Sequence, residues 1–398
     1  MKLHLILDSL LPTRCLKTLC LGVLGLVMTA GCNSAGPPAE KSDLDEDLFS
    51  SPRVHDLALT IAPAELEALK NNKDSHGYVH CTVRAGDRSF DDVGIHCRGN
   101  PKKELSSGKP DFIVTFDEFV SGQRFLGARR ITLQACREDP SYLAAPVAFD
   151  MFRQAGVPAP RCNFARVELN GRKLGLYVVI EAVDRSFLRQ HFRDIKGNLY
   201  DEGDHTDVTG LLDKDRGEDL DDQSDIDGLA AAALQTNPDV RWKQLRQRLD
   251  MERFLTFMAL EVLLWQKDSY ALDARKFRIY HDPKTGLLVF FPKGVESVLE
   301  KTDGPLLPKC KGVVAKAILT TPEGQKEYRE TVRKLLDKVF NPAQVQTRSQ
   351  QLAGVIRPAF GDDAQAVKNF DAAVASFCDA VSRRANFAVE QIKAPLPN

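Results

Sequence analysis

Alternating apolar and polar residues in the first half of the chain predict β-strands. Val54–Ile61 alternates in this way, and a short helix over Ala62–Asn71 follows, with Pro63 suited to its first turn. Turn residues at Ala85-Gly86-Asp87 and at Asn170-Gly171 predict that the runs on either side of them pair as hairpins. The predicted strands cover residues 54–61, 78–84, 89–97, 112–116, 130–133, 164–169 and 174–182.

The second half of the chain has the longer apolar period that is typical of helices. An earlier helix over Ser141–Ala155 is expected to end at Gly156. A sheet-rich half followed by a helix-rich half predicts an α+β fold with two lobes and a cleft between them. The later predicted helices cover residues 226–235, 240–248, 251–266, 312–320, 325–339, 343–357 and 364–393, and strands return only at 277–280 and 287–291.

One predicted helix carries a candidate catalytic carboxylate at its end. Glu252–Trp265 is apolar on nearly all sides, so this helix is expected to be buried. Asp268 follows it and would lie where a core element reaches the rim of the molecule, a fixed position that suits catalysis. The alternative is that Asp268 only begins a turn.

The first residues of the chain are typical of a signal for export. Basic residues precede an uncharged run over Thr18–Ala30, which is too short to span a membrane and suits the apolar part of a signal peptide over residues 1–31. Small residues before Cys32 resemble a bacterial lipobox and predict acylation of its thiol, with plain secretion as the alternative. Residues 32–52 have no apolar periodicity and are predicted to be a flexible tether. We therefore expect a membrane-anchored lipoprotein that faces the periplasm or the cell exterior.

The cysteines that remain after such processing number six. An exported chain permits disulfides among them, but a body of this size does not need disulfides, and all six are equally compatible with small buried hydrophobic residues. No CxxC pair is present, which argues against zinc. The six are Cys81, Cys97, Cys136, Cys162, Cys310 and Cys378.

The formal charge of −1 over 398 residues conceals one strongly acidic stretch. Residues 201–228 contain twelve acidic and two basic residues, so the rest of the chain is near +9. Asp213–Gly217 begins like a calcium-binding EF-hand loop, but glycine comes one position early and the final glutamate is missing. We expect a solvated acidic loop here, and no basic block indicates a nucleic-acid partner.

Many short motifs, in order, resemble the spore-coat protein H (CotH) kinase-like family. The similarity runs from about residue 53 to about residue 395. It rests on Val54-His55-Asp56, Asp92–Asn100, Phe119–Gly127, Asp139-Pro140-Ser141, Phe152–Pro160, Leu169–Tyr177, Glu181–Asp184, Gly197–Tyr200 and Tyr280–Pro283.

The resemblance implies an atypical two-lobed protein-kinase fold. It also implies transfer of phosphate from ATP, with Mg²⁺ or Mn²⁺, to a hydroxyl group of a partner protein. On this view residues 53–184 form a sheet-rich N-terminal lobe, and residues 185–398 form a helical C-terminal lobe that contains the acidic loop.

Three polar positions of the family site can be located, and two of them depart from its pattern. The resemblance places the residue that orients the attacking hydroxyl at Asp268. It places a metal-binding asparagine where this chain has Lys276, and a metal-binding aspartate where it has Glu296. A protonated lysine has no lone pair for a metal, whereas glutamate still offers oxygen ligands. Lys293 adds a second positive charge nearby.

Further assignments come from the same resemblance. Lys109, after a glycine-containing loop that begins at Arg98, would pair with phosphates. The strand that ends at Glu181 and leads to Asp184 would be the hinge that contacts adenine, with an ordinary buried strand as the alternative. The family usually has arginine and glutamate where this chain has Ala144 and Ala145.

Two hypotheses follow for the function. The first is an active envelope kinase with Asp268 as the orienting base and Glu296 as the main metal ligand. The second is a pseudokinase that keeps the fold but acts as a surface-anchored binding or scaffold protein for an unknown envelope partner. The changes at Lys276, Ala144 and Ala145 favour the second.

Overall fold

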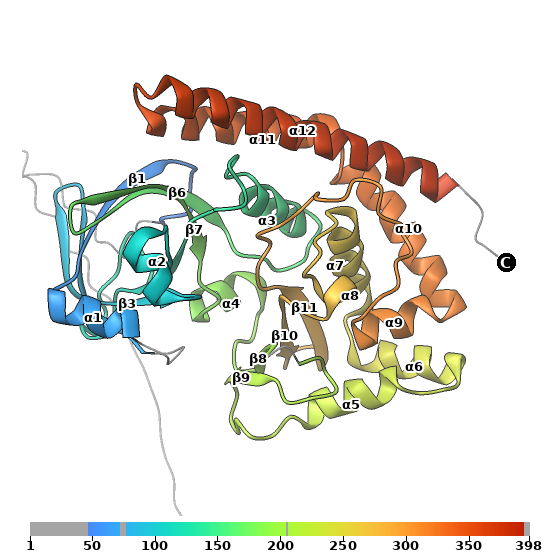
Figure 1. Ribbon diagram of the computed structural model, residues 1–398. Coiled ribbons are helices and arrows are strands. Elements are labelled where there is room, and N and C mark those ends of the chain that lie inside the picture. Colours follow the sequence, from blue (N-terminus) through green and yellow to red (C-terminus); the bar gives the residue numbers. More distant parts are fainter. Residues whose placement is uncertain (1–46, 72–76, 204–205, 394–398) are drawn as a thin grey trace, which may run out of the picture. The chain divides into compact units, whose positions relative to one another are not determined.

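The N-terminal part of the chain forms a closed β-barrel in the computed structural model, which describes residues 47–71, 77–203 and 206–393 (Figure 1). Around the barrel the strands follow the order β1-β2-β3-β4-β5-β7-β6, and the parallel pairing of β6 with β1 closes it. The strands are β1 (Val54–Thr60), β2 (Val79–Ala85), β3 (Arg88–Arg98), β4 (Asp111–Thr115), β5 (Arg130–Gln134), β6 (Cys162–Leu169) and β7 (Arg172–Glu181).

Strand β7 contributes to two hydrophobic cores because successive side chains of a strand point to opposite faces. Tyr177 and Val179 point into the barrel, where they join residues such as Phe112 of β4 and Leu133 of β5. Val178, between them, belongs to the core of the helical part. The strand therefore ties the barrel to the rest of the fold.

The helical part contains a second sheet of order β11-β10-β8-β9. Its strands are β8 (Leu199–Asp201), β9 (Asp213–Arg216), β10 (Phe277–Asp282) and β11 (Leu287–Pro292). The helices of the described residues are α1 (Pro63–Asn71), α2 (Pro101–Ser107), α3 (Ala144–Gln154), α4 (Arg185–His191), α5 (Ser224–Ala233), α6 (Pro238–Arg248), α7 (Met251–Leu263), α8 (Tyr270–Asp273), α9 (Val313–Leu319), α10 (Pro322–Lys338), α11 (Pro342–Ile356) and α12 (Ala364–Lys393), with a 3₁₀ turn at Arg357–Phe360.

Helix α7 is the central element of the helical part. Every residue from Phe254 to Leu263 is buried, because the helix packs against α10, β11 and α12. This confirms the prediction of a buried helix ahead of Asp268. The predicted α+β class is confirmed as well, with the barrel first and the helices after it.

The prediction of a solvated loop over residues 201–228 is wrong in part. The stretch contains the end of β8, all of β9 and the first turn of α5. Strand β9 forms through its backbone pairing with β8. Its residues show no apolar alternation, so their pattern does not predict a strand. Several acids are also bound within the fold: Asp201 pairs with Arg278, and Asp207 accepts hydrogen bonds from Tyr270 Oη and Val313 N at 3.0 and 2.7 Å.

The six cysteines that remain after the predicted processing are free thiols in the structure. Three of them are buried, and the other three are partly exposed. Within the described residues, no helix is both long enough and apolar enough to cross a membrane. Cys32 and the predicted signal peptide lie outside those residues.

Candidate functional site

A cavity of about 310 Å³ brings five of the predicted site positions together. Its lining comes from the end of β3, from β4 and β5, from the segment between β5 and α3, and from the start of α3. The turn between α7 and α8 and the residues just before β10 and after β11 complete it. The lining residues are Arg98, Gly99, Asp111, Gln134, Cys136, Arg137, Glu138, Asp139, Ala144, Ala145, Asp268, Lys276, Glu296 and Ser297.

Asp268 lies on a turn between α7 and α8 that a buried carboxylate holds in place. Glu261, fully buried on α7, accepts hydrogen bonds from the backbone N–H groups of Tyr270 and Ala271 at 3.1 and 2.9 Å. The side chain of Asp268 is partly exposed and has no hydrogen-bond or ion-pair partner among the described residues. It is thus a fixed carboxylate whose oxygens remain available to a ligand.

Arg384 of α12 fixes the other side of the same turn. Its side chain is fully buried and donates hydrogen bonds to the carbonyl groups of Val262 and Leu263, at 2.8 and 3.0 Å, and to that of Gly304. The carbonyl of Leu263 lies in the last turn of α7, where a helix offers no partner of its own, whereas the carbonyl of Val262 also accepts a hydrogen bond from Trp265 N at 3.1 Å. Burial lowers the pKa of Arg384 to about 10, so it remains charged at neutral pH.

Lys276 and Glu296 form an ion pair within the cavity. The Nζ atom of Lys276 lies 3.4 Å from Oε1 of Glu296, with the two side chains 19% and 36% exposed. Burial would raise the pKa of Glu296, but Lys276 and Arg98 outweigh this effect and lower it. Glu296 is therefore an ionised carboxylate whose charge is already balanced by residues of the protein.

Lys293 does not line the cavity. Its ammonium group pairs with Asp201 and lies 3.4 Å from Oε1 of Glu202. Arg278 also pairs with Asp201, at 2.7 Å. The acidic residues at the end of β8 thus neutralise the positive charge of Lys293.

Ala144 and Ala145 begin α3 and present only methyl groups at the cavity, where the resemblance implies an arginine and a glutamate. Both are buried. Asp139 supports this helix start, since its oxygens accept hydrogen bonds from the N–H groups of Ser141 and Ala144 at 3.0 and 2.8 Å. This edge of the cavity therefore offers no side chain that could hold Lys109 or a phosphate.

Lys109 lies outside the residues that line the cavity. Its ammonium group donates to the carbonyl of Ala135 at 2.7 Å and to Tyr142 Oη at 3.3 Å, and it lies 4.7 Å from the ring centre of Tyr177. Burial lowers its pKa to about 8. Its donors are engaged within the fold, and its pairing with phosphate remains a prediction.

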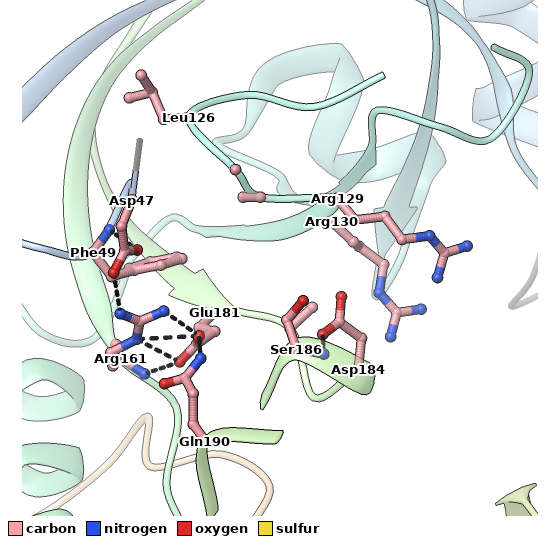
Figure 2. A pocket seen from close by; sticks show the side chains of 13 residues that line it. Asp47, Phe49, Leu126, Arg129, Arg130, Arg161, Glu181, Asp184, Ser186 and Gln190 are labelled. Carbon is pink, nitrogen blue, oxygen red and sulfur yellow. Dashed lines mark hydrogen bonds and ion pairs between the residues drawn. The ribbon is translucent and has the colours of Figure 1, made fainter. Parts of the chain in front are cut away.

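Glu181 and Asp184 line a different cavity, of about 400 Å³ (Figure 2). Glu181 forms an ion pair with Arg161 at 2.6 Å. Asp184 caps the start of α4 by accepting hydrogen bonds from the N–H groups of Ser186 and Phe187 at 2.7 and 3.3 Å. Both carboxylates therefore have structural contacts, and the hinge role of their backbone remains a prediction.

Comparison with known proteins decides the family. The family model described as CotH kinase protein matches residues 95–393, about three quarters of the chain. The chain belongs to the CotH kinase protein family. This confirms the resemblance that the motifs predicted.

Two curated relatives and one solved structure are similar to this CotH family member. It is 21% identical over 355 residues to the inner spore coat protein H of Bacillus subtilis (strain 168), an alignment that covers 83% of this chain and 95% of that protein. It is 38% identical over 56 residues to the inner spore coat protein H-like protein of the same strain, covering 14% and 18%. The crystal structure of the Helicobacter pylori proinflammatory kinase CtkA aligns with a TM-score of 0.29 at 9% identity, covering 68% of this chain and 93% of that one.

The residues of this CotH family cavity do not fit a divalent metal. Mg²⁺ takes oxygen ligands in near-octahedral geometry, and an ammonium group offers it none. Of the two metal positions that the resemblance implies, Lys276 supplies a cation and Glu296 is paired with it. Among the described residues no group of three or more His, Cys, Asp or Glu side chains is placed to hold a metal ion.

Two residues of the site have no functional prediction from the sequence. The sequence predicts Arg98 only as the start of a loop, but this residue lines the cavity and lowers the pKa of Glu296. Glu261 is a single carboxylate inside an apolar helix, and this position is itself a signal that it binds a buried group. The loop after Arg98 also contains α2, a helix that the residue pattern does not predict.

Proposed function

We propose that this CotH family protein binds a ligand or partner through its cavity without transferring phosphate to it. The observation that carries the proposal is the ion pair of Lys276 with Glu296 in the position of the metal ligands. Protein kinases use metal ions to neutralise the charge that develops on the phosphoryl group. A lysine at this position repels such an ion and forms an ion pair with the carboxylate that would bind it.

The setting that we propose is the cell envelope. An uncharged run of signal-peptide length followed by Cys32 supports export and attachment by a lipid, and residues 32–52 would then tether the fold to the membrane. The partner on this view is an envelope protein, which the anchored chain presents or holds in place.

A second candidate function is a working kinase, because one observation favours it. Asp268 lines the cavity, is held rigidly, and has no partner among the described residues. A carboxylate in this state can orient a hydroxyl group and accept its proton. On this view ATP with Mg²⁺ or Mn²⁺ would be the cofactors.

Radiolabel transfer separates the two candidates. The purified full chain in detergent is incubated with γ-labelled ATP and either Mg²⁺ or Mn²⁺, and incorporation into the protein is measured. We expect no label that depends on Asp268. Incorporation that Asp268→Ala abolishes, while Asp379→Ala on the exposed face of α12 leaves it unchanged, would establish the kinase and overturn the proposed function.

A further inference from the structure

Arg98 is a cation of the barrel that the fold leaves available at the cavity. It is the last residue of β3, is partly exposed, and lines the cavity. Its guanidinium group has no hydrogen-bond or ion-pair partner within the described parts of the chain. Since a guanidinium group presents five N–H donors suited to carboxylate and phosphate oxygens, Arg98 is free to bind an anion.

Lys276 approaches the same place from the other side of the cavity. It precedes β10, whereas Arg98 belongs to the barrel, and both act on the carboxylate of Glu296. Two cations therefore act on a single carboxylate at this end of the cavity, although the lining as a whole has five carboxylates and three cations.

The carboxylate of Glu296 lies against Gly294 as well as Lys276. It folds back over Gly294, where a Cβ atom would lie only 2.8 and 2.9 Å from the two carboxylate oxygens. The absence of a side chain at Gly294 thus makes room for the carboxylate beside Lys276. Because these atoms end a flexible side chain and the contact with Lys276 is 3.4 Å, the carboxylate can move aside for a competing anion.

The other charges of the cavity limit how many negative charges a ligand can carry. Arg137 is already paired with Asp111 at 3.3 Å and with Glu104 at 3.4 Å, and the oxygens of Asp139 accept backbone hydrogen bonds. The remaining lining carboxylates are Asp268 and Glu138, the latter accepting a hydrogen bond from Ser297 at 3.2 Å. These two carboxylates would repel a triphosphate more strongly than a phosphate monoester, because a monoester brings at most two negative charges.

We propose that this cavity binds a phosphate monoester without a divalent ion, between Arg98 and Lys276, and that the ligand displaces Glu296, which acts as an internal competitor. The proposal rests on the proposed function, since it names the ligand that the non-transferring cavity would hold. The phosphate could belong to a phosphorylated side chain of a protein or to a small molecule.

Calorimetry in the presence of EDTA tests the proposal with the full chain in detergent. The probes are a phosphoserine peptide, its unphosphorylated form, inorganic phosphate and ATP. We expect the phosphoserine peptide or inorganic phosphate to bind and ATP to bind more weakly than either. Tighter binding of the peptide indicates a protein ligand, and equal binding indicates a small molecule.

Four variants test the roles of the residues. Arg98→Ala and Lys276→Ala should each weaken binding about tenfold or more, as expected for the loss of a hydrogen bond to a charged group. Glu296→Gln and Gly294→Ala should both strengthen binding, because the first removes the competing charge and the second pushes it away. Arg383→Ala and Glu390→Gln, on the exposed surface of α12, are the matched controls and should change nothing.

Three results would overturn this inference: binding that requires Mg²⁺, no binding of any phosphate probe at millimolar concentration, or no gain from either Glu296→Gln or Gly294→Ala. The radiolabel experiment is read separately. A chain that neither binds phosphate nor transfers it loses this inference but keeps the proposed function, whereas a chain that transfers phosphate loses the proposed function.

Discussion

The Nδ1 atom of His281 lies 2.8 Å from Oδ2 of Asp225 and links β10 to the start of α5. Asp225 also accepts hydrogen bonds from Tyr200 Oη at 2.6 Å and from Asn198 Nδ2 at 3.0 Å. Burial would raise the pKa of Asp225, but these hydrogen bonds outweigh burial and lower it to about 2. An acid of the stretch 201–228 thus joins the second sheet to the helices.

We expect this contact to make stability depend on pH at the acidic end. The pKa of Asp225 is depressed from 3.8 in the unfolded chain to about 2 in the fold, so its contribution is complete above the unfolded value and is lost as pH falls toward 2. Asp225→Asn should therefore cost about 2 kcal/mol at pH 6 and much less at pH 2. Urea unfolding of both proteins between pH 2 and 6 measures this, and a cost that does not change with pH would contradict it.

His281 should show the opposite dependence. The hydrogen bond that the imidazole of His281 donates to Asp225 is the largest effect on the pKa of His281 and raises it above 6.5. Its contribution to stability is complete below pH 6.5 and is lost as pH rises through the folded value. A proton NMR titration of the imidazole in the wild type should give a pKa above 6.5, and Asp225→Asn should lower that value.

Substitution of Arg384 should be among the most destabilising changes in the helical part. Arg384→Ala removes the buried donor of the Leu263 and Gly304 carbonyl groups, and we expect a loss of about 3 kcal/mol or more in the free energy of unfolding. The neighbouring Arg383 is exposed, and among the described residues it pairs only with Asp379 on the same helix, so Arg383→Ala should change stability by less than about 0.5 kcal/mol. Similar losses for the two variants would mean that the buried contacts of Arg384 contribute little.

Glu261 should stabilise the conformation of the turn that carries Asp268. Burial raises its pKa well above the usual value, and the two backbone N–H groups that it binds act in the opposite direction. Glu261→Ala removes the acceptor of both N–H groups and should cost about 2–4 kcal/mol, with faster amide hydrogen exchange at Tyr270 and Ala271 than in the wild type. Exposed Glu390→Ala is the control, and unchanged exchange at these two residues would contradict the assigned role.

Much of the architecture could be predicted from the sequence where the apolar pattern is strong. The run from Phe254 to Leu263 is apolar on nearly all sides, and it is buried as that pattern requires. Strand β9, with the sequence Asp213-Lys214-Asp215-Arg216, could not be predicted, because it forms through backbone pairing with β8 and not through burial of its side chains.

The pairing within the candidate site could not be predicted, because it depends on the register of a hairpin. Phe277 of β10 pairs with Pro292 of β11, which places the segments before and after these strands side by side. Lys276 and Glu296 meet as a result, although they are 20 residues apart. The family pattern predicts both positions. Only the structure shows that Lys276 forms an ion pair with Glu296 and that Lys293 forms one with Asp201.

Restoring the two departures should restore affinity for a metal. The double variant Lys276→Asn and Glu296→Asp replaces the ammonium group by an amide with an oxygen ligand and frees a carboxylate, so we expect it to bind Mn²⁺ where the wild type does not. Titration followed by electron paramagnetic resonance detects the loss of free Mn²⁺. Lys293→Asn, which changes a lysine outside the cavity, is the control and should bind no metal. Equal Mn²⁺ affinity in the wild type and the double variant would show that Lys276 does not exclude the ion.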